Sequence, residues 1–137
     1  MKSTILFLLV TGALLVFSCS KKEDPPPAPV NYTVDYQLLL TGGYTDLKIE
    51  YYETGLNWQE LTNPTLPWQA AFTNFVQGDS VKMEFRFLTV PGTNYNYTMV
   101  VKVTKGGSVI AIDSSSMSAT NVPVVIPIQD QWGYKIP

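Results

Sequence analysis

Very few side chains in this chain could carry out covalent chemistry. Cys19 is the only cysteine, and the sequence contains no histidine. A thiolate is a nucleophile and a metal ligand, but catalysis or zinc binding by Cys19 would need histidine or further cysteine partners. The remaining candidates are carboxylates, and these alternate with apolar residues as charges on the faces of strands do. We therefore predict a protein that is not an enzyme, has no catalytic residues, and uses no cofactor or metal.

Cys19 follows an apolar N-terminal segment. Residues 5–17 are apolar except for Thr11 and Gly12, and they follow a positively charged start. This run is shorter than the roughly 20 apolar residues that span a bilayer. A short apolar run behind a positive start is typical of a secretory signal peptide. We assign residues 1–18 to a signal peptide and exclude them from the folded domain.

The residues directly before Cys19 indicate how the chain is anchored. Leu15 lies four positions before the cysteine, and the small residue Ser18 lies next to it. This pattern resembles the lipobox of bacterial lipoproteins, which implies cleavage before Cys19 and lipidation of its thiol. One acyl chain binds a membrane reversibly, whereas two or three anchor a protein stably. The alternative is an unmodified thiol in an ordinary secretory protein.

A charged and proline-rich stretch follows Cys19. Residues 20–24 read Ser-Lys-Lys-Glu-Asp, which resembles the export signal of Bacteroidetes-type surface lipoproteins; a solvated spacer is the alternative. Residues 25–29 read Pro-Pro-Pro-Ala-Pro, which favours an extended polyproline II stalk. We therefore assign residues 19–30 to a lipidated cysteine and a tether. The expected location is the outer membrane, either exposed at the surface or facing the periplasm.

Residues 31–137 have the length and composition of one folded domain. They contain six Lys or Arg residues and nine Asp or Glu residues, for a net charge of −3. A nucleic-acid partner is excluded, because it would need a basic surface. Attraction to anionic lipid headgroups by charge is excluded for the same reason.

Alternation of apolar and polar residues predicts strands throughout this domain. The clearest case is 80–88, where apolar side chains at every second position alternate with charged ones. Similar alternation predicts strands at 32–40, 44–53 and 97–104. The expected inward-facing residues are Val34, Tyr36, Leu38, Leu40, Leu47, Ile49, Tyr51, Val81, Met83, Phe85, Phe87, Tyr97, Met99, Val101 and Val103.

Glycine-containing turns connect these strands. Thr41-Gly42-Gly43 predicts a hairpin between 32–40 and 44–53, and Gly106-Gly107 predicts a second hairpin from 97–104 into 108–113. Further strands are expected at 56–61, with Trp58 facing inward, and at 68–76. Pro123 and Pro127 confine 121–128 to a sheet edge. Asp113 to Ser116 is expected to form a hydroxyl-rich turn. The sum is an all-β sandwich of about seven or eight strands.

The order of several motifs resembles a known family. Tyr36 precedes the Gly42-Gly43 turn, residues 46–51 read Asp-Leu-Lys-Ile-Glu-Tyr, and Leu66-Pro67-Trp68 comes about fifteen residues later, before an alternating strand and a glycine hairpin. Together these motifs resemble the MmpS family of small mycobacterial membrane proteins, over most of 31–118. The resemblance implies an immunoglobulin-like β-sandwich and a role as an accessory to MmpL-type export transporters. The family has an N-terminal transmembrane helix, where this chain has the lipobox-like segment.

Aromatic residues near loops are the candidate ligand contacts. Tyr95 and Tyr97 flank Asn96 beside a Pro-Gly loop, and aromatic faces next to amides suit sugar rings. The alternative is that Tyr97 faces the core and Tyr95 belongs to the loop. Trp132, near the C-terminus, is either an exposed contact or a cap on the core. For Trp58 and Trp68, packing in the core and a ligand platform are both considered.

Two functions from different classes follow. The first is a membrane-anchored, non-enzymatic interaction module of the cell envelope, which binds a protein partner and, by the family resemblance, serves a transporter. The alternative is a surface glycan-binding lipoprotein that uses Tyr95, Tyr97 and Trp132.

Overall fold

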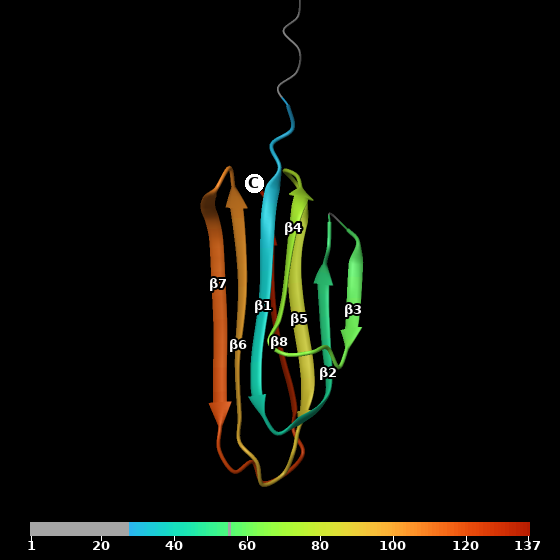
Figure 1. The fold of residues 1–137 in the computed structure, drawn as a ribbon, viewed down its shortest axis with the longest axis vertical. Helices are drawn as coiled ribbons and strands as arrows, with labels where there is room; N and C mark the ends of the chain where they lie inside the picture. The colour runs from blue at the N-terminus through green and yellow to red at the C-terminus, as the bar shows by residue number, and fades with distance from the viewer. Residues whose placement is uncertain (1–27, 55) are drawn as a thin grey trace, which may run out of the picture.

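The structure is a computed structural model that describes residues 28–54 and 56–137 (Figure 1). The predicted signal peptide, Cys19 and most of the tether lie outside the described residues. The folded part consists of eight strands: β1 (Tyr32–Gly42), β2 (Tyr44–Tyr52), β3 (Trp58–Thr62), β4 (Trp68–Phe75), β5 (Ser80–Thr89), β6 (Tyr95–Lys105), β7 (Ser108–Ala119) and β8 (Pro127–Lys135).

The strands form two antiparallel sheets of four. Sheet A has the order β4-β1-β6-β7, and sheet B has the order β3-β2-β5-β8 (Figure 1). The predicted all-β class, the sandwich architecture and the number of strands are confirmed. In immunoglobulin constant domains the first, second, fourth and fifth strands share a sheet. Here β1 and β2 lie in different sheets, where β1 pairs with β6 and β2 pairs with β5.

The core lies between the two sheets and follows the alternation of the sequence. Every residue predicted to face inward on the strands at 32–40, 44–53, 80–88 and 97–104 is buried. The central strands β1, β5 and β6 alternate most regularly between buried and partly exposed positions. Full burial of one large apolar side chain contributes about 1.5–3 kcal/mol, so these strands supply most of the hydrophobic stabilisation.

The connection at 41–43 is not the predicted hairpin. β1 and β2 lie in different sheets, so this segment crosses between the two layers. Gly42 has φ +100°, and a Cβ there would overlap the Asn94 carbonyl. The Gly43 N–H donates to that carbonyl at 2.9 Å. The two glycines therefore allow the backbone to pass close to the 90–94 loop as it crosses between the sheets, and they do not form a tight hairpin turn.

The hairpin at Gly106-Gly107 is confirmed, and it is longer than predicted. β7 continues to Ala119, so Asp113 to Ser116 lies within a strand, where Ser114 is paired with Val100. The predicted strand at 121–128 is wrong in most of its length, because β8 begins only at Pro127. Trp132 to Tyr134 therefore lies inside the last strand, paired with β5.

The two ends of the sandwich differ in what they hold. The end where the chain enters β1, called here the proximal end, holds the β6–β7 hairpin and the C-terminus, which lies beside β1 in Figure 1. Ile136 is buried there and joins Asp79 and Gly78 through backbone hydrogen bonds of 3.0 Å. The distal end holds the loops at 41–43, 90–94 and 120–126, which are joined by backbone hydrogen bonds to one another.

Candidate functional site

Tyr95 and Tyr97 are core residues. Their exposed fractions are 6% and 3%, and both rings pack edge-to-face on phenylalanines of β5, with centroids 5.5 Å from Phe87 and 4.8 Å from Phe85 respectively. The Tyr97 hydroxyl donates to Asp130 at 3.1 Å. Rings buried in this way cannot stack on a ligand from solvent. The interpretation of these tyrosines as ligand contacts is therefore corrected to a packing role.

Trp132 lies on β8, opposite Met83 of β5. Its half-buried ring stacks on Tyr134 with centroids 5.8 Å apart and packs against the core. Trp68, also half-buried, lies 5.1 Å from the ring of Tyr51. Both tryptophans cover the edge of the core, and they do not converge with Tyr95 and Tyr97 on a common site.

Trp58 faces outward, contrary to the prediction. It lies on the short edge strand β3 and is 37% exposed. Its ring lies edge-to-face on Tyr52 at 4.9 Å, and the Lys82 ammonium lies 5.2 Å from its centroid. The reason is the register, because Tyr52, which is paired with Trp58, is on the outward face of β2 while its neighbour Tyr51 is inward.

The outer face of sheet B, called here the sheet B face, is ordered into rows that run across its four strands. The first row is aromatic and ends in a glycine, the second is acidic, and the third is basic at its centre. These rows are Trp58, Tyr52, Lys82, Gly133; then Glu60, Glu50, Glu84, Gln131; then Thr62, Lys48, Arg86, Gln129. Neighbours in a row are paired across the strands, except that Tyr52 and Lys82 lie one position beyond the last pair of β2 with β5.

Opposite charges are paired between these rows. Lys48 lies 2.9 Å from Glu60, and Lys82 lies 3.2 Å from Glu84. Glu84 also accepts a hydrogen bond from Gln129 at 2.6 Å. The hydrogen bond from Lys48, and then its charge, lower the pKa of Glu60. This shift favours the ionised form of Glu60 as the partner of Lys48. Within 28–54 and 56–137, no three acidic, histidine or cysteine side chains gather to hold a metal ion.

A hollow of about 310 Å³ lies at the glycine end of the aromatic row. Gly133 on β8 lies in its lining, paired with Lys82 on β5. Two lysines and a serine hydroxyl reach it, and none of its lining residues is acidic. The lining consists of Tyr52, Ser80, Val81, Lys82, Gly133, Tyr134 and Lys135.

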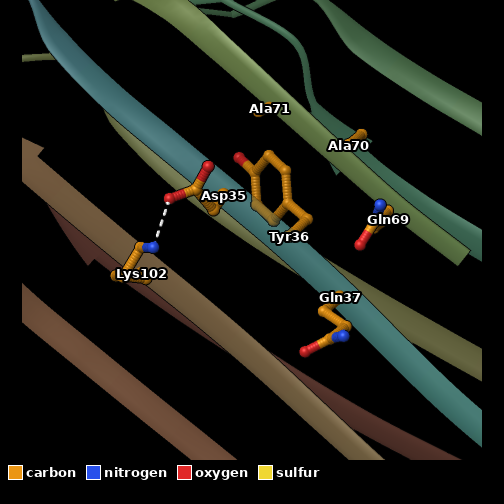
Figure 2. Close-up of a pocket in the computed structure, with 7 residues that line it drawn as sticks. All are labelled: Asp35, Tyr36, Gln37, Gln69, Ala70, Ala71 and Lys102. Carbon is orange, nitrogen blue, oxygen red and sulfur yellow. Dashed lines mark ion pairs between the residues drawn. The ribbon is translucent and has the colours of Figure 1, made fainter.

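A second hollow, of about 440 Å³, lies on the outer face of sheet A. Figure 2 shows its lining on the neighbouring strands β1, β4 and β6, with Asp35 joined to Lys102. That ion pair measures 2.8 Å, and the amides of Gln37 and Gln69 complete the polar lining. Ala71, which is on the outward face of β4, leaves the space open because its side chain is small.

Aliphatic side chains surround this second hollow. Ile112 on β7 is paired with Lys102 on β6, and Val100 on β6 is paired with Gln37 on β1. Leu39 lies two positions after Gln37 along β1. Leu39 is 40% exposed and Ile112 is 63% exposed. We call this set, Asp35, Gln37, Leu39, Gln69, Ala71, Val100, Lys102 and Ile112, the sheet A face.

The alternation in the sequence already places Asp35, Gln37 and Lys102 on outward positions. Their convergence could not be read from it, because β1 pairs with β4 and β6, which lie far away in the chain. The same holds for Trp58 and Gly133, which reach one row of sheet B from its opposite edges.

No protein-family model and no curated protein matches this chain. In the part of the chain that the structure describes, no helix has the length and hydrophobicity needed to cross a membrane.

Proposed function

We propose that this protein is a lipid-anchored, non-enzymatic interaction module of the cell envelope. Its anchor is the lipidated Cys19, its location is the outer membrane, and its partner is a protein. The lipobox-like pattern at Leu15 to Cys19 and the charged, proline-rich tether support this proposal. We expect Cys19→Ala to move the protein from the membrane fraction to the soluble fraction while the domain stays folded. A variant that remains in the membrane fraction would rule out the lipid anchor.

The sheet A face is the observation that best supports a protein partner. It combines exposed Leu39 and Ile112 with two amides and a single ion pair, Asp35–Lys102. Protein interfaces have a similar make-up, in which charged residues are depleted at the centre and polar groups lie at the rim. The sheet B face, with its rows of acidic and basic side chains, has less of this character.

Site-specific photocrosslinking in intact cells tests this assignment. A crosslinking residue at Gln37 is expected to give a discrete product, and one at Arg86 on the opposite face is the matched control. Leu39→Asp and Ile112→Asp should abolish the product from position 37 without changing protein level. Equal products from both faces, or a product that survives both substitutions, would contradict docking on the sheet A face.

A more specific form of this proposal names a transporter as the partner, and the resemblance to the MmpS family supports it. Identification of the product crosslinked at position 37 by mass spectrometry tests it. A membrane transporter subunit is the expected identity, and a soluble envelope protein would refute the transporter-accessory role while leaving the docking face in place.

The second candidate function is glycan binding at the cell surface. A specific observation favours it: exposed Trp58 and half-buried Tyr52 form an aromatic pair beside a hollow lined by two lysines and a serine. Sugars are bound by aromatic rings that contact their apolar faces and by polar groups that bind their hydroxyls. A glycan array probed with the wild type and with Trp58→Ala tests it. A blank array for the wild type would refute this function.

A further inference from the structure

We propose that the hollow over Gly133 is a binding site for a saccharide that carries a carboxylate group. The inference rests on the glycan-binding function given above and names the site and the class of ligand. Three observations support it: the fold does not require glycine at position 133, aromatic side chains lie next to the hollow, and the charged side chains that line the hollow are lysines.

Gly133 lies in the interior of β8, paired with Lys82, where a residue with a side chain would be expected. It does not adopt the left-handed backbone conformation that favours glycine. A Cβ at this position would meet nothing closer than the Val81 carbonyl oxygen at 3.8 Å, which is an ordinary contact. Folding therefore does not demand glycine here. Glycine inside a strand weakens it and often marks a bulge, a bend or the close approach of a ligand or another backbone. The register of β8 on β5 is regular through Gly133, so no bulge accounts for it.

The absence of a side chain at Gly133 keeps the hollow open. Tyr52 forms part of its wall, and Trp58 extends the aromatic surface across the edge of the sheet. A pyranose ring has an apolar face and a rim of hydroxyls, so it needs an aromatic surface with donors and acceptors close by. Here the Ser80 hydroxyl and the Lys82 ammonium lie in the same lining.

The charge of the lining selects the class of saccharide. Lys82 and Lys135 both line the hollow, and no acidic residue does. Glu84, two positions along β5 from Lys82, is engaged by Lys82 at 3.2 Å and by Gln129 at 2.6 Å. A carboxylate on the ligand would meet the ammonium group of Lys135, together with that of Lys82, which it would share with Glu84. Charge-assisted hydrogen bonds of this kind are stronger than neutral ones.

The test measures binding of tri-galacturonic acid and of neutral tri-galactose to the purified full-length protein in detergent. Gly133→Leu fills the hollow. Gln131→Leu is its matched control, because it places the same side chain on the same face of β8, two positions away. We expect Gly133→Leu to weaken the binding of the acidic saccharide by about tenfold or more, and Gln131→Leu to leave it nearly unchanged. Lys135→Gln should lower the affinity for the acidic saccharide and reduce its dependence on salt.

Four results would overturn the inference in distinguishable ways. If the wild type binds neither saccharide, glycan binding and this site both fail. If folded Gly133→Leu binds like the wild type, the site is wrong and the function survives. Equal affinity for the neutral saccharide refutes the ligand class. Equal binding to vesicles with anionic headgroups and no sugar shows a charged surface instead of a saccharide site. If Gly133→Leu does not fold, Trp58→Ala and Lys135→Gln decide the question.

Discussion

The Tyr36 hydroxyl links the two sheets, and its removal gives the sharpest test of the packing described here. Tyr36 lies on β1 of sheet A with 1% of its surface exposed, and its hydroxyl donates to the Tyr52 carbonyl of sheet B at 2.8 Å. Burial raises the pKa of this hydroxyl well above its usual range, while a hydrogen bond with the Lys82 backbone opposes the rise. The hydroxyl thus reaches the backbone of β2 and β5 at the point where their pairing ends.

Tyr36→Phe keeps the ring and removes only the oxygen. A buried carbonyl left without its donor costs about 1–3 kcal/mol, and we expect this loss in the free energy of unfolding. For a domain of this size the corresponding fall in Tm is about 4–8 °C per kcal/mol. Urea unfolding followed by circular dichroism and by tryptophan fluorescence measures it.

Tyr44→Phe is the matched control for this substitution. The half-buried Tyr44 ring packs on Phe87 at 6.1 Å, and its hydroxyl has no hydrogen-bond partner among the described residues. We expect this variant to stay close to the wild type. If Tyr36→Phe loses no more stability than Tyr44→Phe, the hydroxyl does not contribute as an inter-sheet bond and the reasoning is wrong.

Three further predictions concern the core and the distal end. Burial, and next the hydrogen bond to Asp130, raise the pKa of Tyr97 from 10.0 to about 12, which favours the protonated phenol in the folded state. Its contribution to stability should therefore be complete below pH 10 and fall as the pH rises towards about 12; Tyr97→Phe, which lacks the group, should show a smaller fall when unfolding is measured against pH. Thr89→Val removes a buried hydroxyl that donates to the Val124 carbonyl at 3.2 Å, so we expect a loss of about 1–3 kcal/mol and faster hydrogen exchange in 120–126; unchanged exchange there would contradict this anchoring role. Phe85→Ala should cost about 3–5 kcal/mol because it empties a fully buried aromatic position, and a loss below 1 kcal/mol in urea unfolding would show that the core between the sheets is not packed as described.

The fold class could be predicted because alternation is a local signal. Each central strand shows its buried face in its own residues, as in Val81 to Phe87, and the structure buries those positions. The hairpin at Gly106-Gly107 is also local and was predicted correctly. The connection at 41–43 was not, because a glycine pair looks the same in a tight turn and in a crossing between sheets. Which partner a strand takes is decided by residues far away in the sequence.

The candidate contacts were less predictable, for a physical reason. Tyr95 and Tyr97 follow a loop signal, but β6 begins at Tyr95 and both rings enter the core. Trp58 was expected to face inward, but its direction depends on the pairing of β3 with β2. Gly133 carries no signal by itself. Its importance emerges only when β8 is placed beside β5.

The position of β1 at the centre of sheet A has a mechanical consequence. The chain enters the domain at Tyr32, and β1 is hydrogen-bonded to β4 on one side and to β6 along its full length on the other. A force applied to the chain before Tyr32, directed along β1, would act along the axis of this strand. It would have to shear two ladders at once, instead of opening one bond after another. A domain pulled from this end of β1 would therefore resist unfolding more than one pulled from an edge strand.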